Sequence, residues 1–154
     1  MKTLILFATK HGCTEQAARA LAQHLGNAEL INIAECTPDL GAYDDVIIGS
    51  SIYVGQINKA LSQWLSQNTA ALQEKRLGLF VCCGQAEKAM EQLTAAFPGE
   101  LVQGAVAKGY FGYDFTRLSF GEKLICKAIG APIGKSELRT AEIGSFAASF
   151  AREA

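Results

Sequence analysis

The chain of 154 residues lacks two features that define common functional classes. It has no long apolar run: the segment from Leu4 to Ala8 is too short for a signal-peptide core or a membrane span, and no later stretch is long enough to cross a bilayer. It also has no run of basic residues, and its net charge of -1 creates no field that attracts nucleic acid. We therefore expect a cytoplasmic protein with no transmembrane segment and no nucleic-acid ligand.

The cysteines also lack the spacing of a metal site or of a disulfide framework. There are five, an odd number, and two of them are adjacent in the sequence: Cys13, Cys36, Cys82, Cys83 and Cys126. This arrangement predicts reduced thiols, several of them buried as small apolar side chains, and no metal site.

The composition is that of a globular protein. Hydrophobic residues make up 49% of the chain and charged residues 19%, and no low-complexity tract interrupts it. A chain of this length buries roughly two thirds of its unfolded surface in one core. We predict a single domain over residues 1–154.

Short apolar segments alternate with segments of helical periodicity. Strands are expected over Thr3–Ala8, Glu29–Ile33, Asp45–Ser50, Leu77–Cys82 and Leu101–Ala107, and helices over Gln16–Leu25, Ile57–Leu72, Ala86–Ala96 and Ile143–Phe150. Parallel strands need crossover connections, which helices provide. The pattern predicts an α/β fold with a doubly wound parallel sheet, whose ligand site lies beyond the carboxyl ends of its strands.

The loop T-K-H-G-C-T follows the first predicted strand and leads into the first predicted helix. Unpaired N–H groups and the positive end of the helix dipole favour an anion at such a junction. Thr9 and Thr14 offer hydroxyl groups, and Gly12 allows a close backbone approach. The loop therefore suits a phosphate, although Thr14 as a helix start and Gly12 as a turn residue would explain it without a ligand.

The same loop is neither a Walker A motif nor the dinucleotide fingerprint G-x-G-x-x-G. It resembles the phosphate loop of the flavodoxin family, T/S-x-T-G-x-T, which holds the phosphate of FMN. His11 stands where the family commonly has a hydroxyl residue, and Lys10 adds a positive charge. The resemblance assigns cofactor binding to the whole loop, namely Thr9, Lys10, His11, Gly12, Cys13 and Thr14.

Two later loops resemble the segments that flank the flavin ring in flavodoxins. The first is G-S-S-I-Y-V-G, in which Tyr53 or Ile52 would cover the ring unless Tyr53 is an ordinary half-buried aromatic residue. The resemblance implies FMN as the cofactor and a three-layer fold with strand order 2-1-3-4-5. The second loop is C-C-G-Q, which follows the fourth predicted strand. The cofactor-binding residues that the resemblance implies in the two loops are Ser50, Ser51, Ile52, Tyr53, Val54, Gly55, Cys82, Cys83, Gly84 and Gln85.

An aromatic segment, K-G-Y-F-G-Y-D-F-T-R-L-S-F-G-E-K-L-I-C-K, covers residues 108–127 and looks like an insertion. It carries four basic residues against two acidic ones, whereas the whole chain is slightly negative. One interpretation is an excursion that shields the core. The other is a docking surface near Tyr110, Phe111 and Tyr113 for a redox partner protein or a small hydrophobic substrate. Peripheral contact with a membrane stays open.

The stretches M-K-T-L-I-L-F-A-T, G-S-S-I-Y-V-G and K-L-I-C-K-A-I-G together are similar to the flavodoxin-like, quinone-dependent protoporphyrinogen oxidase group. We expect an FMN-binding redox protein, either an electron carrier or a small oxidoreductase. Two alternatives are an oxidase of that group, which passes electrons to a quinone, and a binding module that has lost the flavin. No side chain is expected to act as a catalytic acid or base. Thiol exchange between the flavin and Cys82–Cys83 is a minor hypothesis.

Overall fold

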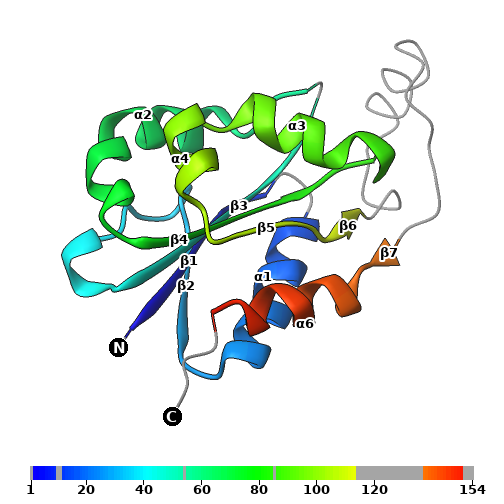
Figure 1. Ribbon diagram of the computed structural model, residues 1–154, viewed down its shortest axis with the longest axis horizontal. Helices are drawn as coiled ribbons and strands as arrows, with labels where there is room; N and C mark the ends of the chain where they lie inside the picture. Colours follow the sequence, from blue (N-terminus) through cyan, green and yellow to red (C-terminus); the bar gives the residue numbers. More distant parts are fainter. Residues whose placement is uncertain (1, 10–11, 54, 85, 114–136, 151–154) are drawn as a thin grey trace.

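A parallel five-stranded sheet forms the centre of the protein. The computed structural model describes residues 2–9, 12–53, 55–84, 86–113 and 137–150. The strands are β1 (Thr3–Ala8), β2 (Ala28–Asn32), β3 (Asp45–Ser51), β4 (Arg76–Cys82) and β5 (Ala107–Tyr110), and they lie in the order β2-β1-β3-β4-β5 (Figure 1). Both the fold class and the strand order predicted from the sequence are confirmed.

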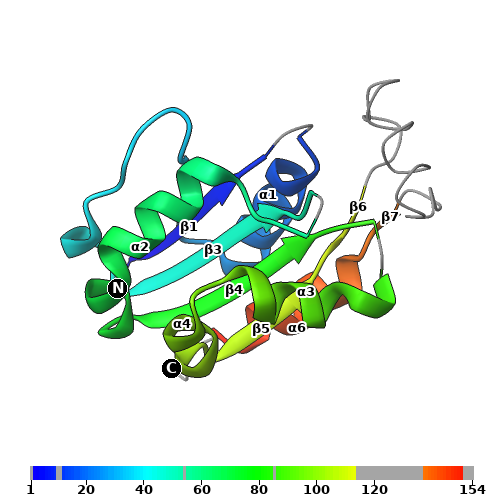
Figure 2. The ribbon, with the colours of Figure 1, turned by 90° about the horizontal axis from the view of Figure 1, so that it is seen from above.

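Helices cover both faces of this sheet and complete three layers (Figure 2). One face carries α1 (Cys13–Leu25) and α6 (Thr140–Ala148), and the other carries α2 (Lys59–Gln73), α3 (Ala89–Ala96) and α4 (Gly99–Gly104). Two short 3-10 helices, η1 (Leu40–Ala42) and η2 (Ala86–Lys88), lie in the connections. No helix in the described part of the chain combines the length and the hydropathy needed to cross a membrane.

The strand predicted over Leu101–Ala107 is wrong in its position. Leu101 and Val102 belong to α4, where they are buried, and β5 starts only at Ala107. The apolar run is divided because α4 packs on α2 and α3 before the chain enters the sheet. Periodicity cannot distinguish a short buried helix from a strand in so short a run.

The predicted aromatic insertion begins inside regular structure. Its first residues form the end of β5 and the short strand β6 (Gly112–Tyr113), which pairs antiparallel with β7 (Glu137–Leu138). This pair of strands was not predicted. The remainder of the predicted insertion, residues 114–127, lies outside the described residues.

Aromatic rings pack against glycines on the face that α1 and α6 cover. Phe80 stacks on Phe111 with 4.6 Å between the ring centroids, and the ring of Phe146 meets both edge-on. A Cβ added to Gly49 would overlap the ring of Phe80, and one added to Gly78 would lie 2.7 Å from Phe146. These strands therefore need glycine where the rings lie against the backbone.

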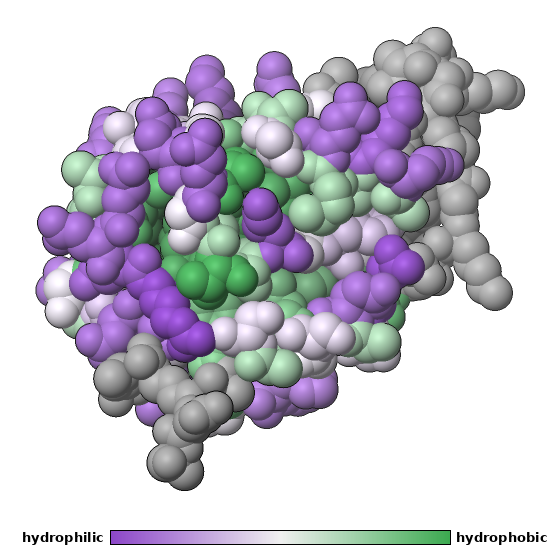
Figure 3. All heavy atoms as spheres, viewed as in Figure 1, coloured by the Kyte–Doolittle hydropathy of each residue, from purple (hydrophilic) through white to green (hydrophobic). Residues whose placement is uncertain are grey.

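The strand β5 forms one edge of the sheet. The molecular face that carries this edge shows a band of apolar and weakly polar side chains between more polar borders (Figure 3). The band lies over β5, with α3 and α4 on one side and α6 on the other (Figures 1 and 3).

We expect Gly49→Ala to destabilise the protein because the new methyl group would displace the buried Phe80 ring. The free energy of unfolding should fall by about 1–3 kcal/mol, the usual cost of overpacking a core. Urea unfolding followed by circular dichroism would measure it. The matched control is Gly99→Ala, whose added Cβ meets nothing within 4 Å and should leave the stability unchanged or slightly higher. Equal unfolding midpoints for the two variants would contradict the packing interpretation.

Candidate functional site

A cavity of about 520 Å³ opens where β1 and β3 end. The register pairs Ala8 with Ser50, so the two strands end side by side at the carboxyl edge of the sheet. After β1 the chain adds β2 on one side of β1 and then β3 on the opposite side. The strand order therefore reverses between β1 and β3. The cavity is lined by Ala8, Thr9, Ser50, Ser51, Tyr53, Gln56, Ile57, Asn58 and Lys59.

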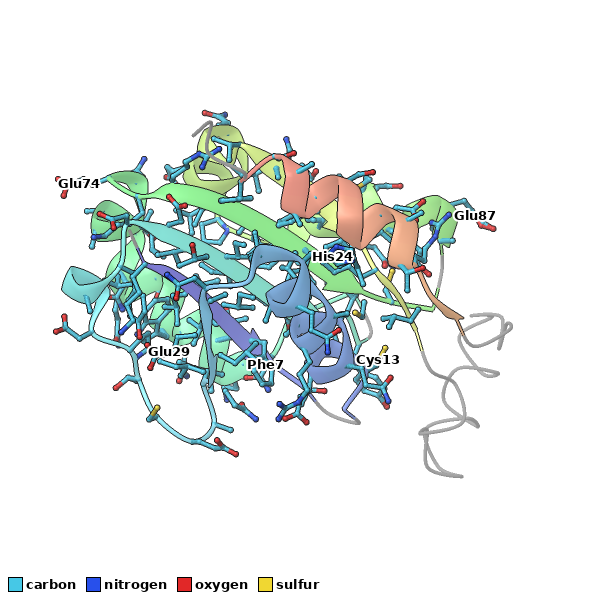
Figure 4. The ribbon with its side chains drawn as sticks, turned by 90° about the horizontal axis from the view of Figure 1, so that it is seen from below. Phe7, Cys13, His24, Glu29, Glu74 and Glu87 are labelled. Carbon is cyan, nitrogen blue, oxygen red and sulfur yellow. The ribbon has the colours of Figure 1, made fainter. Side chains whose placement is uncertain are left out.

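The loop after β1 approaches this cavity through a left-handed glycine. Gly12 has a φ of 85° and donates its N–H to the hydroxyl of Thr9 at 2.8 Å. It stands at the N-terminus of α1 and has no side chain that would cap the helix. A helix start without a side-chain cap leaves backbone donors for an anion. Figure 4 shows Cys13 at the end of the molecule toward which the strands point, with Glu74 at the opposite end.

A hydrogen bond between two hydroxyl groups joins the first two loops. Thr14 Oγ1 and Ser51 Oγ lie 2.6 Å apart, and Thr14 is fully buried. Thr14 does not line the cavity itself, but its partner Ser51 does. The structure therefore brings these two predicted residues together across 37 positions of sequence.

The loop after β3 is held by the start of α2. The hydroxyl of Ser50 accepts the N–H of Asn58 at 3.2 Å, and the Asn58 side chain caps α2 by accepting the N–H of Leu61 at 3.2 Å. Tyr53 and Gln56 exchange two backbone hydrogen bonds, of 2.9 and 3.1 Å, which close a tight turn. Gly55, with a φ of 75°, takes the left-handed position in this turn. A second helix N-terminus is thus fixed beside the cavity.

Tyr53, and not Ile52, faces the cavity. Ile52 is buried in the core beneath α2, and its N–H binds the carbonyl of Cys82 at 2.9 Å. Tyr53 is half-buried and forms part of the cavity lining. Of the two residues expected to cover a flavin ring, the structure therefore leaves Tyr53 as the candidate.

The loop after β4 does not line this cavity in the described residues. Cys82 and Cys83 alternate between the two faces of the sheet: Cys82 lies in the core with Cys13 under α1, and Cys83 lies in the core beneath α2 and α3. Their thiols point apart, which argues against a disulfide between them. A hydrogen bond with Cys13 and complete burial raise the pKa of Cys82 well above its usual range.

Two of the three aromatic residues expected at a docking surface, Tyr110 and Phe111, are core residues. Phe111 is fully buried beneath α6, where its ring stacks on Phe80, so this ring is not available to a partner. Tyr110 is also buried, and its hydroxyl donates to the carbonyl of Cys83 at 3.0 Å. Tyr110 therefore supports the loop after β4. The strand contacts of β5 and β6 explain this correction, because they carry the start of the segment into the core.

The remaining predicted site residues divide into two groups. Lys10, His11, Val54 and Gln85 lie outside the described residues. Gly84 is described but is not part of the cavity lining.

The sequence interpretation missed Gln56, Ile57, Asn58 and Lys59, which line the cavity from the start of α2. An asparagine directly before a helical pattern is a common N-cap, and this signal at Asn58 would have predicted a second helix N-terminus.

The lining combines hydroxyl groups, the N-terminus of α2 and one lysine. Thr9, Ser50 and Ser51 provide hydroxyl groups, and Lys59 carries a positive charge in the first turn of α2. Such a set suits a ligand that has a phosphate or several hydroxyls, and Tyr53 offers an apolar ring for a planar group.

Comparison with known proteins identifies related chains. A family model described as a flavodoxin domain matches residues 4–139. Protoporphyrinogen IX dehydrogenase (quinone) of Escherichia coli K12 is 35% identical over 77 residues, which cover 47% of this chain and 42% of that protein. The uncharacterized protein MJ0298 of Methanocaldococcus jannaschii is 38% identical over 69 residues, with 44% and 45% covered. Less than half the length of either relative is therefore matched.

Solved structures share the fold at low sequence identity. The solution structure of two-electron reduced Megasphaera elsdenii flavodoxin has a TM-score of 0.63 and 14% identity, and the match covers 97% of this chain and 99% of that one. Fusobacterium nucleatum flavodoxin bound to flavin mononucleotide has a TM-score of 0.57 and 15% identity, with 97% and 96% covered. At these identities the match shows the fold alone.

We expect Cys82 to resist alkylation in the native protein. Its raised pKa leaves little reactive thiolate at about pH 8, and its burial excludes the reagent, whereas Cys36 is exposed. Peptide mapping by mass spectrometry after iodoacetamide treatment should show Cys82 modified more slowly than Cys36 by about an order of magnitude or more. In urea the two rates should converge. Equal rates in the native protein would contradict the described position of Cys82.

Proposed function

The chain belongs to the flavodoxin domain family, and we propose that it binds FMN at the cavity between β1 and β3 and transfers electrons through it. The observation that carries the proposal is that the loops after β1 and β3 are joined at the point where the strand order reverses. Thr14 and Ser51 link them by a 2.6 Å hydrogen bond, and Gly12 presents the N-terminus of α1 without a side-chain cap. Backbone donors at a helix start favour a phosphate.

The residues that surround the cavity fit a flavin nucleotide. A volume of about 520 Å³ is within the range of roughly 300–1,000 Å³ that is usual for sites of small ligands. The loop after β1 would hold the phosphate. Ser50, Ser51 and Asn58 offer polar groups for the ribityl chain, and Tyr53 offers its ring for the flavin. A protein of the same fold has been solved with this cofactor: the structure of Fusobacterium nucleatum flavodoxin contains flavin mononucleotide.

Bound FMN supplies the redox chemistry, because it accepts and releases one or two electrons. The chain's own residues bind and orient it. Among the described residues we assign no catalytic acid or base, and the Cys82 thiol stays protonated because its pKa is raised. The carbonyl of Cys83 is fixed by the Tyr110 hydroxyl at 3.0 Å, which keeps the loop after β4 in place beside the carboxyl edge of the sheet.

A second candidate function is oxidation of a substrate with transfer of its electrons to a quinone. It is favoured by the 35% identity over 77 residues to protoporphyrinogen IX dehydrogenase (quinone) of Escherichia coli K12. The alignment covers less than half of that protein, so its activity and its substrate are proposals for this chain. An electron carrier that docks on basic partners is ordinarily strongly acidic, and the net charge of -1 therefore favours this second candidate modestly.

We expect the purified protein to bind one FMN per chain and to quench its fluorescence. Thr14→Val should weaken binding about twofold to tenfold, because it removes the hydrogen bond that positions Ser51 in the cavity lining, and a neutral bond of this kind contributes about 0.5–1.5 kcal/mol. The matched control is Thr94→Val on α3, whose hydroxyl binds the carbonyl of Met90 at 2.9 Å outside the cavity lining; it should bind FMN like the unmodified protein. Absence of binding at high FMN would overturn the proposal and favour a flavin-free binding module.

The route of reduction should distinguish the two candidate functions. A redox titration followed by absorption spectroscopy reports whether the bound flavin is reduced in two separate one-electron steps or in one two-electron step. We expect a direct two-electron reduction, together with re-oxidation of the reduced protein by a water-soluble quinone. Two well-separated steps and no reaction with the quinone would instead support a one-electron carrier.

A further inference from the structure

A groove runs along the free edge of the sheet, away from the cavity between β1 and β3. It has a volume of about 540 Å³, and β5 forms its floor between α3 and α6. None of the residues that line it also lines the cavity at the ends of β1 and β3. The groove coincides with the apolar band on the face shown in Figure 3.

The backbone of β5 presents unused hydrogen-bonding groups to this groove. Val106 donates its N–H to the carbonyl of Leu77 on β4 at 2.8 Å. Backbone groups alternate in direction along a strand, so Ala107 and Gly109 turn their N–H and C=O groups away from β4. Within the described residues β4 is the only strand that pairs with β5. An open edge of this kind is a template for another strand.

Two large apolar side chains are exposed in the groove, among polar and charged ones. The large hydrophobic residues that are exposed in the described part of the chain are Met90, at 44%, and Val106, at 52%, and both line this groove. Met90 comes from α3 and Val106 from the segment that enters β5. Two apolar contacts therefore lie beside one free backbone edge.

Of the charged residues that line the groove, Lys108 is the one available to an acidic ligand. Arg139 and Glu142 form an ion pair at 3.3 Å, and the Arg139 guanidinium also lies 5.1 Å above the ring centroid of Tyr110. Lys108 is exposed on β5, and the residues that the structure describes offer it no ion-pair partner. The lining as a whole thus carries one uncompensated positive charge, which favours a ligand with an acidic group.

We propose that the groove binds an extended peptide segment of another protein, which adds to the sheet as a strand along β5. Its backbone would pair with Ala107 and Gly109, an apolar side chain would contact Met90 and Val106, and an acidic side chain would lie opposite Lys108. A second copy of the chain fits less well. Its own β5 also carries the exposed Lys108, so pairing of two copies would bring like charges together along the joined edges.

The first test selects ligands from a phage-displayed library of random seven-residue peptides, with the full chain as the target. We expect enriched sequences with alternating apolar residues and at least one acidic residue. Synthetic versions should bind with an affinity that falls at least tenfold on Val106→Asp. The matched control is Ala70→Asp, the same charge change at an exposed position of α2 outside the groove, which should bind as the unmodified protein does. Circular dichroism verifies that both variants are folded.

A charge reversal tests the contribution of Lys108. Lys108→Glu should weaken the selected acidic peptide at least tenfold, and replacement of the acidic residue of the peptide by lysine should restore most of the loss. Methylation of alternate backbone nitrogens in the peptide should abolish binding in one of the two registers, because it removes the donors that pair with β5.

Hydrogen exchange measured by NMR provides the readout at the strand itself. The amides of Ala107 and Gly109 should exchange rapidly in the free protein and become protected when the peptide binds. The proposal is overturned if no peptide is enriched, if binding is the same for Val106→Asp and the unmodified protein, or if these two amides are already protected without peptide. Each outcome is independent of FMN, because the groove and the cavity share no lining residue.

Discussion

The parallel pairing of β1 with β3 places two loops at one point. The register runs from Thr3 opposite Asp45 to Ala8 opposite Ser50, and both strands are buried along nearly their whole length. Because the strands end together, the loop after β1 and the loop after β3 meet, and the Thr14 and Ser51 hydroxyls come within 2.6 Å. A shift of the register by one residue would turn each strand's side chains to the opposite face and separate these hydroxyls. The candidate cofactor site therefore depends on this pairing.

Packing on the two faces of the sheet supports different parts of the surface. Beneath α1 and α6 the rings of Phe80, Phe111 and Phe146 fill the space over glycines, so the strands and helices approach closely there. This face also holds Cys13 and Cys82 in one cluster below the loop after β1. At the edge, β5 has a partner only on its β4 side in the described chain. The same sheet thus offers a polar cavity at its carboxyl end and an apolar groove along its side.

The loops predicted to bind a cofactor lie beside the candidate cavity, but several residues that line this cavity were not predicted. The phosphate-loop resemblance identified Thr9, Gly12 and Thr14, and the structure places them at the start of α1 beside the cavity. The sequence could not rank Ile52 against Tyr53, because burial depends on how the turn closed by Gly55 directs each side chain. It also missed Asn58 and Lys59, which lie at the cavity because the turn between Tyr53 and Gln56 brings the start of α2 back beside the end of β3. The side chains of two predicted docking residues, Tyr110 and Phe111, were assigned to the surface although both are buried.

The sequence by itself determined the class of fold, because buried strands and amphipathic helices leave local patterns that do not depend on distant residues. Its loop motifs T-K-H-G-C-T and G-S-S-I-Y-V-G indicated the family by resemblance. Only the tertiary structure decided that Cys82 and Cys83 face opposite sides of the sheet, that Thr14 meets Ser51, and that the apolar run after Pro98 is divided between α4 and β5. It also decided that the β5 edge lies in a groove flanked by α3 and α6. These features are contacts between segments far apart in the chain, and their energies come from packing and pairing that no local pattern records.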